Sequence, residues 1–237
     1  MEIKILFNSS SNNDCLSVGW GLSFLIDKKI MFDAGEKGDL IANNINKLKA
    51  DLSLVEAVVI SHDHRDHTGG LWDVLKLGSN IKVYGCPGFS LEFKRRVSEF
   101  ASKLIDADNF TLIAAGIYST GEIIGTYKGE NISEQALIIK TEKGFSVITG
   151  CAHPGIIKIL DRVKMQLSIN EFYAVLGGFH LKDHSIKDVE KIVKKFGELK
   201  VKRVGATHCS GTNAENIFKE KYRDNFLDMK VGQVITV

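Results

Sequence analysis

This chain contains little proline, few cysteines and almost no net charge for a length of 237 residues. Its two prolines, together with the lack of any repeat or low-complexity tract, leave no obvious linker. Because a chain of this length can bury one large core, we expect a single domain over residues 1–237. The four cysteines lie far apart and form no C-x-x-C pair, which excludes a disulfide scaffold and favours free thiols in a reducing compartment.

Charge and hydropathy argue against further classes of protein. A formal net charge of +2 lacks the basic excess of a general nucleic-acid binder, although a local patch can still attract a small anionic substrate. No uncharged apolar run is long enough to span a bilayer, and residues 1–7 lack the pattern of a signal peptide. We therefore expect a cytoplasmic protein that binds neither nucleic acid nor membranes, with its oligomeric state left open.

Strand-like and helix-like segments alternate along the chain, which predicts one compact α/β domain with mixed sheets. A hairpin closed by Asp27 and Lys28 is expected near the start. The expected strands are 3–7, 21–26, 29–32, 55–60, 81–84, 110–114, 136–140, 145–149, 173–176, 201–206 and 233–237. The expected helices are 39–48, 71–77, 156–167, 186–199 and 214–226.

The segment 87–109 allows two interpretations. Residues 90–104 are helix-like, with apolar side chains on one face and the basic Lys94, Arg95 and Arg96 among them. We expect an amphipathic helix that packs its apolar face on the core. The alternative is a cap over a functional site that helps to hold an anionic substrate.

The segment 61–67 carries the strongest functional signal. It holds three imidazoles and a carboxylate that can bind metal, namely His62, His64, Asp66 and His67. Imidazole nitrogen and carboxylate oxygen are the usual ligands of catalytic zinc and related divalent metals. A polar loop that happens to contain histidines is the alternative, but three of the seven histidines of the chain fall in these seven residues. The segment therefore predicts a metal site.

Apolar runs elsewhere also end in side chains that can bind metal or hydrogen-bond. The residues at or just beyond these predicted strand ends are Asp33, His62, His153, His180 and His208. Because sites in α/β proteins gather at the carboxyl ends of strands, these side chains are expected to converge. Each histidine alone could be structural, but the set favours metal ligation because a metal needs several preorganised ligands.

For three other residues near these histidines we favour roles other than metal binding. His184 lies in a polar stretch and is expected to be an exposed loop residue. Cys151 and Cys209 adjoin candidate ligands and could bind a soft metal. We expect each instead to be a small buried hydrophobe.

The pattern His62-x-His64-x-Asp66-His67, followed by His153 and His208, resembles the metallo-β-lactamase superfamily over nearly the whole chain. Further strings are similar to one subgroup, the dihydropterin-methyl-ribofuranosyl-aminobenzene-phosphate synthases and related metal-dependent hydrolases. These strings are residues 21–23, 150–155, 177–181 and 207–209. In addition, Phe32-Asp33-Ala34-Gly35 resembles the first motif of the whole superfamily.

The resemblance implies a four-layer αβ/βα sandwich, with two mixed β-sheets and helices on both outer faces. It also implies a site for one or two divalent ions, expected to be zinc, with manganese or iron as alternatives. The first ion would be held by His62, His64 and His153. The second would be held by Asp66, His67 and His208.

One position departs from the superfamily pattern. Where most members have a bridging aspartate, the strand-end residue here is His180. A neutral imidazole offers one free lone pair and normally binds one metal, whereas a carboxylate can bridge two. His180 is therefore a terminal ligand or a substrate-binding residue, or else Asp183 takes the bridging place.

The predicted function is metal-dependent hydrolysis, by a metal-activated water, of a small phosphorylated or carboxylated substrate. Asp66 would orient that water or move its proton, and His180 would donate to an oxyanion or phosphate. Asp33 would hydrogen-bond a ligand imidazole and fix its tautomer. A helix starting after Thr68 would add positive potential. The alternatives are a pterin-related transferase that catalyses a dihydropterin condensation, and a non-catalytic metal- or pterin-binding protein.

Overall fold

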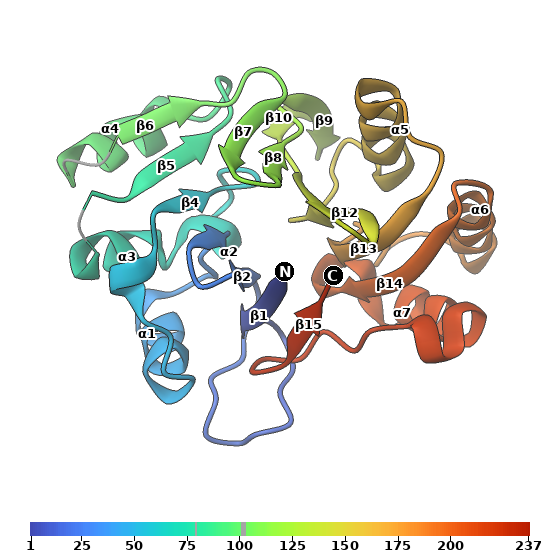
Figure 1. The fold of residues 1–237 in the computed structure, drawn as a ribbon, viewed down its shortest axis with the longest axis horizontal. Helices are drawn as coiled ribbons and strands as arrows, with labels where there is room; N and C mark the ends of the chain where they lie inside the picture. The colour runs from blue at the N-terminus through green and yellow to red at the C-terminus, as the bar shows by residue number, and fades with distance from the viewer. Residues whose placement is uncertain (79, 101–102) are drawn as a thin grey trace. The chain divides into compact units, whose positions relative to one another are not determined.

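The computed structural model describes residues 1–78, 80–100 and 103–237 of the chain. Two compact units are present. Unit 1 comprises residues 1–108 and 230–236, and unit 2 comprises residues 109–229 with Val237. Figure 1 shows unit 1 from blue to green with the red C-terminal strand, and unit 2 from green to red. Each unit has its own sheet and helices, and the single-domain assignment stays a prediction.

Unit 1 is built on a seven-stranded mixed sheet in the order β15-β1-β2-β3-β4-β5-β6. Strands β3 to β6 are parallel, and the remaining pairs are antiparallel. The predicted hairpin is confirmed, because Asp27 and Lys28 adopt φ values of 44° and 63° in the turn between β2 and β3. The strands are β1 Glu2–Phe7, β2 Ser23–Ile26, β3 Ile30–Phe32, β4 Ala57–Val59, β5 Lys82–Gly85, β6 Lys103–Asp106 and β15 Val234–Thr236.

The helices of unit 1 bury one apolar stripe each. Helix α1 buries Ile41 and Ile45 at i, i+4 spacing, and α4 buries Phe93 and Val97 in the same way. The other helices of this unit are short, so packing rather than length stabilises them. The bounds are α1 Gly38–Lys47, α2 Arg65–Thr68, α3 Leu71–Leu77 and α4 Leu91–Glu99, with a 3-10 helix η1 at Leu52–Leu54.

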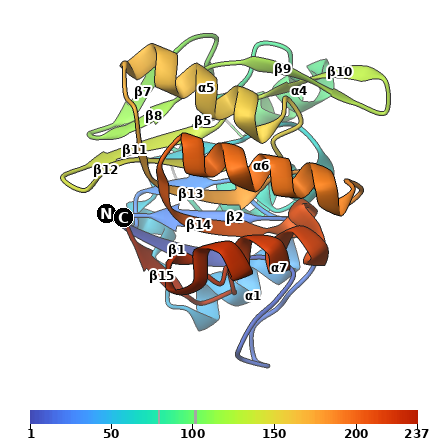
Figure 2. The same ribbon diagram turned by 90° about the vertical axis from the view of Figure 1, so that its right-hand side faces the viewer.

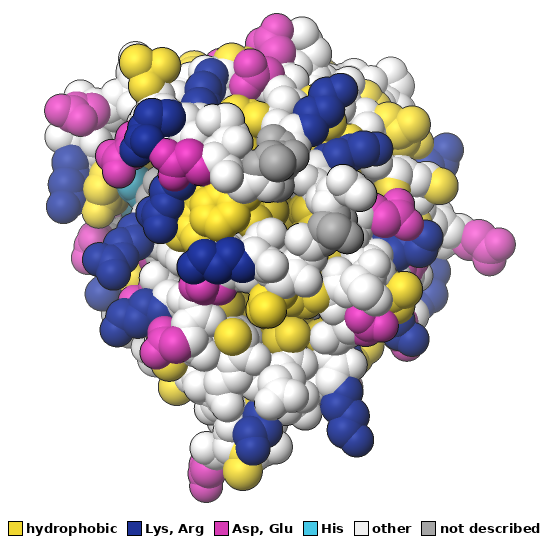
Figure 3. Space-filling model, turned by 90° about the vertical axis from the view of Figure 1, so that its left-hand side faces the viewer, with side chains coloured by type: hydrophobic (Ala, Val, Ile, Leu, Met, Phe, Trp, Pro, Cys, Tyr) yellow, Lys and Arg dark blue, Asp and Glu magenta, His cyan; other side chains and the backbone are white. Residues whose placement is uncertain are grey.

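The helix predicted over residues 90–104 is too long. It ends at Glu99, and Leu104 lies in β6, because residues 103–106 pair in parallel with β5. Residues 101 and 102 of the predicted segment lie outside the described residues. Leu91 is 85% exposed, and Figure 3 shows hydrophobic side chains at the surface of this face between Lys and Arg side chains. Because α4 buries Phe93 and Val97, the expected packing of its apolar face on the core is confirmed, while the cap role stays a prediction.

Unit 2 contains a six-stranded mixed sheet in the order β14-β13-β12-β11-β8-β7 and a separate hairpin of β9 and β10. Strands β12, β13 and β14 are parallel, and β13 is apolar along its length because parallel strands are covered on both faces. The strands are β7 Thr111–Ala114, β8 Ile117–Ser119, β9 Ile123–Tyr127, β10 Glu130–Glu134, β11 Leu137–Thr141, β12 Gly144–Thr149, β13 Phe172–Gly178 and β14 Val201–Thr207.

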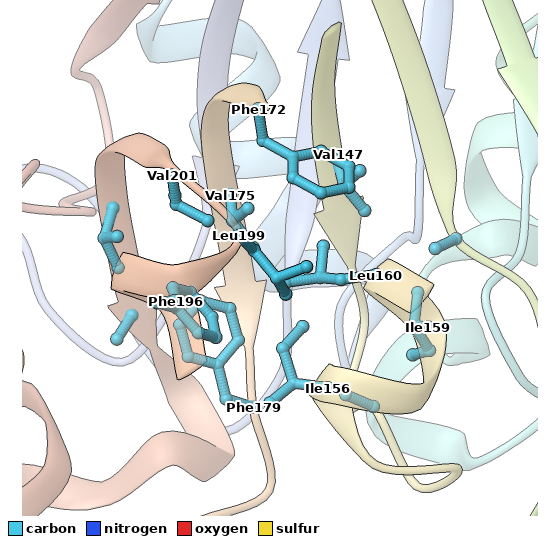
Figure 4. Packing of buried hydrophobic residues seen from close by; sticks show 14 of the residues in the cluster. Val147, Ile156, Ile159, Leu160, Phe172, Val175, Phe179, Phe196, Leu199 and Val201 are labelled. Carbon is cyan, nitrogen blue, oxygen red and sulfur yellow. The ribbon is translucent and has the colours of Figure 1, made fainter. Parts of the chain in front are cut away.

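Three helices pack along this sheet, as Figure 2 shows: α5 Ile156–Leu167, α6 Ile186–Glu198 and α7 Gly211–Tyr222. Short 3-10 helices, η2 His208–Ser210 and η3 Arg223–Asn225, flank α7. The core between helices and sheet includes Phe172, Phe179 and Phe196, labelled in Figure 4. Burial of each such side chain stabilises the fold by about 1.5–3 kcal/mol.

Some predicted elements of unit 2 are wrong or missing. Strands β8, β9 and β10 were not expected, because their short runs are interrupted by glycine and charged residues. The last helix begins at Gly211 rather than at residue 214 and ends at Tyr222 rather than at 226, where η3 follows. Among the described residues, no helix combines the length and apolar character needed to cross a membrane.

Candidate metal centre

The parallel pair β3 and β4 brings two motifs of unit 1 to one sheet edge. Asp33 follows β3, and Ser61 and His62 follow β4 at the same carboxyl end. The backbone N–H of Asp33 donates to the carbonyl of Val59, which joins the two strand ends. Asp33 has a φ of 58°, a left-handed conformation that aspartate tolerates better than most residues.

Asp33 organises the histidines of the motif through hydrogen bonds. Its Oδ1 accepts from the backbone N–H of Ser61 at 2.7 Å, and its Oδ2 accepts from the Ser61 hydroxyl at 2.8 Å. The same Oδ2 lies 2.6 Å from Nδ1 of His67. Oγ of Ser61 in turn lies 2.9 Å from Nδ1 of His62. Because both Nδ1 atoms are engaged, Nε2 is the atom that each of His62 and His67 would offer to a metal.

Electrostatics strengthens the link between Asp33 and His67. Burial alone would lower the pKa of the His67 imidazole, but the charge of Asp33 and hydrogen bonds to Asp33 and Asp66 raise it to about 10. Both side chains of the pair are fully buried. Asp33 thus stabilises positive charge on this ring, whether the charge comes from a proton or from an ion bound at Nε2.

The short helix α2 places the last two residues of the motif. The backbone N–H groups of His67 and Thr68 donate to the carbonyl of His64, which forms the short helix α2, and the helix expected after Thr68 is α3, which begins at Leu71. Oδ2 of Asp66 lies 3.3 Å from Nε2 of His67. The His62 ring lies 4.8 Å from that of His64 and 4.2 Å from that of His67, measured between centroids. The four predicted ligands of unit 1 are therefore gathered.

A hollow of about 620 Å³ in unit 1 borders this motif. Asp63, Arg65 and Thr68 line it from the motif side, and Arg96 lines it from α4. The guanidinium of Arg96 lies 4.1 Å from the centroid of the Trp72 ring. The other two basic residues considered for a cap turn elsewhere, since Lys94 donates to the carbonyl of Pro87 and Arg95 pairs with Glu99. Of the three basic residues of α4, Arg96 is therefore the one placed to bind an anion in this hollow.

In unit 2, the parallel strands β12, β13 and β14 end at one edge, where each is followed by a histidine. His153 follows β12, His180 follows β13 and His208 follows β14. His180 and His208 adopt φ values of 53° and 55°. Left-handed backbone is uncommon for histidine and clusters at functional sites, where the surrounding structure holds it in place.

Glu134, at the end of β10, is a buried partner of a candidate ligand that the sequence did not indicate. Its Oε2 accepts from the backbone N–H of His153 at 2.8 Å and lies 2.9 Å from Nδ1 of the same ring. Its Oε1 accepts from the backbone N–H groups of Cys151 and Ala152. Burial opposes its charge, yet these hydrogen bonds and His153 lower the pKa of the Glu134 carboxyl. Glu134 thus plays toward His153 the part that Asp33 plays toward His67.

His180 lies among the ligand candidates of unit 2. Its ring centroid is 4.6 Å from that of His153, and its backbone N–H donates to Sγ of Cys209 at 3.3 Å. Contact with Cys209 raises the pKa of His180, although burial opposes the shift. Nδ1 of this ring is buried and has no hydrogen-bond partner among the described residues. Such an atom is costly unless a ligand or metal engages it.

The remaining polar residues of this edge divide into buried and exposed groups. Cys151 and Cys209 are buried free thiols, as predicted. Burial would raise the pKa of the Cys209 thiol, but hydrogen bonds involving Cys151 and His180 hold it well below its ordinary value. His184 is exposed, as predicted. Asp183 is also exposed and joins none of the clusters that could hold a metal among the described residues.

The chemistry of these donors fits a divalent ion of the zinc type. Each unit offers one imidazole whose Nδ1 is held by a buried carboxylate, His67 by Asp33 and His153 by Glu134, the usual arrangement behind metal-binding histidines. Imidazole and thiol donors prefer borderline metals over magnesium or calcium. The model of the metallo-beta-lactamase superfamily matches residues 19–208. This chain belongs to that superfamily.

Two similar proteins cover nearly the whole chain. The 7,8-dihydropterin-6-methyl-4-(beta-D-ribofuranosyl)-aminobenzene-5'-phosphate synthase of Methanocaldococcus jannaschii is 30% identical, over 91% of this chain and 89% of its own length. The crystal structure of a metal-dependent hydrolase of the beta-lactamase superfamily is 32% identical, with a TM-score of 0.82 over 100% of this chain and 99% of that one. The human tRNase Z short form, at 14% identity and a TM-score of 0.62, shares the fold.

These likenesses confirm the predicted family and the predicted fold, two mixed sheets with helices. The chain is a metal-dependent enzyme of this superfamily, with histidine, aspartate and cysteine clusters typical of its metal sites. The ligand assignments to His62, His64, Asp66, His67, His153 and His208 stay predictions.

Proposed function

We propose that this protein is a metal-dependent hydrolase acting on a small phosphorylated or carboxylated substrate. The observation that carries the proposal is the buried hydrogen bond of 2.6 Å between Asp33 and Nδ1 of His67. It holds a proposed ligand imidazole in one orientation before any metal binds. A catalytic metal site requires preorganisation of this kind.

The proposed ligands are those that the family resemblance implies. His62, His64 and His153 would hold one ion, and Asp66, His67 and His208 a second. Zinc best suits this donor set, with manganese or iron as alternatives. When bound, the ions would supply Lewis acidity and lower the pKa of a coordinated water toward neutrality.

Asp66 is the proposed acid–base residue of this chain. Its side chain is 21% exposed, whereas His67 beside it is fully buried. A carboxylate with one oxygen near a ligand imidazole and partial access to solvent can orient an attacking water and take its proton. We propose a small anionic molecule as the substrate, with no role for nucleic acid or membranes.

A pterin-related transferase is the second candidate. The observation that favours it is the 30% identity to a protein named as a dihydropterin synthase. In a condensation, the same ligands would hold an ion against a phosphate or pyrophosphate leaving group. A non-catalytic metal- or pterin-binding protein is a third candidate, because His180 replaces the bridging aspartate and Asp183 is exposed.

Metal analysis combined with a substrate screen tests the proposal. We expect one or two equivalents of zinc-type metal, and metal-dependent cleavage of a generic phosphodiester, lactone or thioester. His64→Ala should lose metal and activity, whereas His184→Ala, at an exposed position outside the clusters, should keep both. Metal binding without any hydrolysis, together with tight pterin binding, would instead favour the transferase or the binding protein.

A further inference from the structure

We propose that Cys151, His153 and His180 form a thiolate–imidazole metal site, in which Cys151 contributes a sulfur ligand. This role replaces the buried-hydrophobe role expected for Cys151 and the substrate-donor role expected for His180. The inference shares only His153 with the proposed function and rests on it for that residue. All three residues belong to unit 2.

The geometry of the three donors supports a single ion. One candidate ligand atom from each residue lies within 4.8 Å of those from the other two. Zinc–nitrogen bonds of about 2.0–2.1 Å and zinc–sulfur bonds of about 2.3 Å put donors on one ion at most about 4.4 Å apart, so these three donors need to move only slightly inward to bind it. The rings of His153 and His180 already face one another at 4.6 Å between centroids.

Two hydrogen-bond networks hold the donors in place. Glu134 accepts from the backbone N–H of Cys151 and engages Nδ1 of His153, so it positions two of the three ligands and leaves Nε2 of His153 for the ion. Sγ of Cys209 accepts from the backbone N–H of His180, which holds that residue in its left-handed conformation. Nδ1 of His180 is buried and has no hydrogen-bond partner among the described residues. It is the atom of this ring that would bind the ion.

The donor set selects the kind of metal. A thiolate with two imidazoles is a soft to borderline set, which favours zinc and disfavours manganese, magnesium and calcium. Three protein ligands leave the fourth tetrahedral position open, as in catalytic rather than structural zinc sites. Since Nε2 of His153 can bind one ion, this donor set is an alternative to His62 and His64 as the partners of His153. Cys151 loses its thiol proton to solvent when the ion binds.

Cobalt substitution tests the sulfur ligand directly. Co²⁺ titrated into the metal-free protein, up to two equivalents, should give an intense near-ultraviolet thiolate-to-cobalt charge-transfer band. Cys151→Ser should abolish this band and weaken zinc binding more than about tenfold, the lower end of the effect for residues that only support ligands. Cys86→Ser is the matched control, because Cys86 is also a buried free thiol but joins none of the possible metal-binding clusters among the described residues, and it should keep the band.

A measurement on the unaltered protein covers the case in which a cysteine variant does not fold. X-ray absorption of the zinc-loaded chain should show one sulfur neighbour at about 2.3 Å among nitrogen neighbours. Zinc bound by nitrogen and oxygen alone would overturn the sulfur ligand while leaving the proposed hydrolase intact. A band kept in Cys151→Ser would overturn it too. If the zinc-loaded protein showed the sulfur neighbour but hydrolysed no substrate, the proposed function would be overturned and the sulfur ligand would stand.

Discussion

At the scale of single residues, two buried carboxylates do similar work in the two units. Asp33 engages Nδ1 of His67, and Glu134 engages Nδ1 of His153. Asp33 could be predicted because it follows an apolar strand and matches a family motif. Glu134 could not, because it becomes a partner of His153 only when β10 folds beside the loop after β12.

Replacement of Asp33 by asparagine should weaken metal binding about 10- to 100-fold. The amide keeps the size of the side chain but removes the charge that favours positive charge on His67. Calorimetric titration of the metal-free protein with zinc measures the change. Asp161→Asn, at an exposed position on α5, serves as the control and should bind zinc normally. Equal affinities for the two variants would show that Asp33 does not support a ligand.

Replacement of Glu134 by alanine should lower the free energy of unfolding by about 3 kcal/mol or more. The change leaves the buried backbone N–H groups of Cys151, Ala152 and His153 without their acceptor, and each such loss costs about 1–3 kcal/mol. Glu134→Gln keeps an acceptor oxygen and should lose clearly less. Urea denaturation of the metal-free variants distinguishes them, and similar losses for both would contradict this account.

At the scale of elements, the parallel strands of each unit decide where the polar side chains gather. Long elements such as β13 and α5 were predictable from their apolar patterns. A continuous apolar run indicates a strand covered on both faces, as in β13, and a helical period indicates a helix buried on one face, as in α5. Strands β8 to β10 were not, because short edge elements owe their conformation to neighbours rather than to local propensity.

Replacement by alanine should change stability in opposite directions at two glycines, Gly177 in β13 and Gly197 in α6. Gly177 has a φ of 113°, and a Cβ there would lie 2.0 Å from the carbonyl oxygen of Thr149. Gly177→Ala should therefore destabilise the protein severely or prevent folding. Gly197 lies in α6 with open space around it, so Gly197→Ala should stabilise by about 0.5–1 kcal/mol. Thermal unfolding measures both changes, and a destabilised Gly197→Ala would contradict the helix argument.

At the scale of the whole molecule, the proposed ligands come from distant parts of the chain: His62, His64, Asp66, His67, His153 and His208. Metal binding should therefore stabilise the folded chain as a ligand does, in proportion to RT ln(1 + [M]/Kd).

Removal of metal with a chelator should lower the melting temperature of the full chain. At a zinc concentration 100-fold above the dissociation constant, the stabilisation lost would be about 2.7 kcal/mol. Differential scanning calorimetry with and without zinc gives the difference. His64→Ala should lose most of this shift, and His184→Ala should retain it. An identical shift in both variants would show that zinc acts away from the motif.

The residue types and their spacing were enough to predict the family, the metal chemistry and most long elements. This is because metal ligands are few in kind and buried runs carry the period of their secondary structure. Only the tertiary structure revealed Glu134 behind His153, the approach of Cys151 to His180 and the short helix α2. Contacts of this kind join residues far apart in the chain or depend on single hydrogen bonds, so no local pattern along the sequence records them.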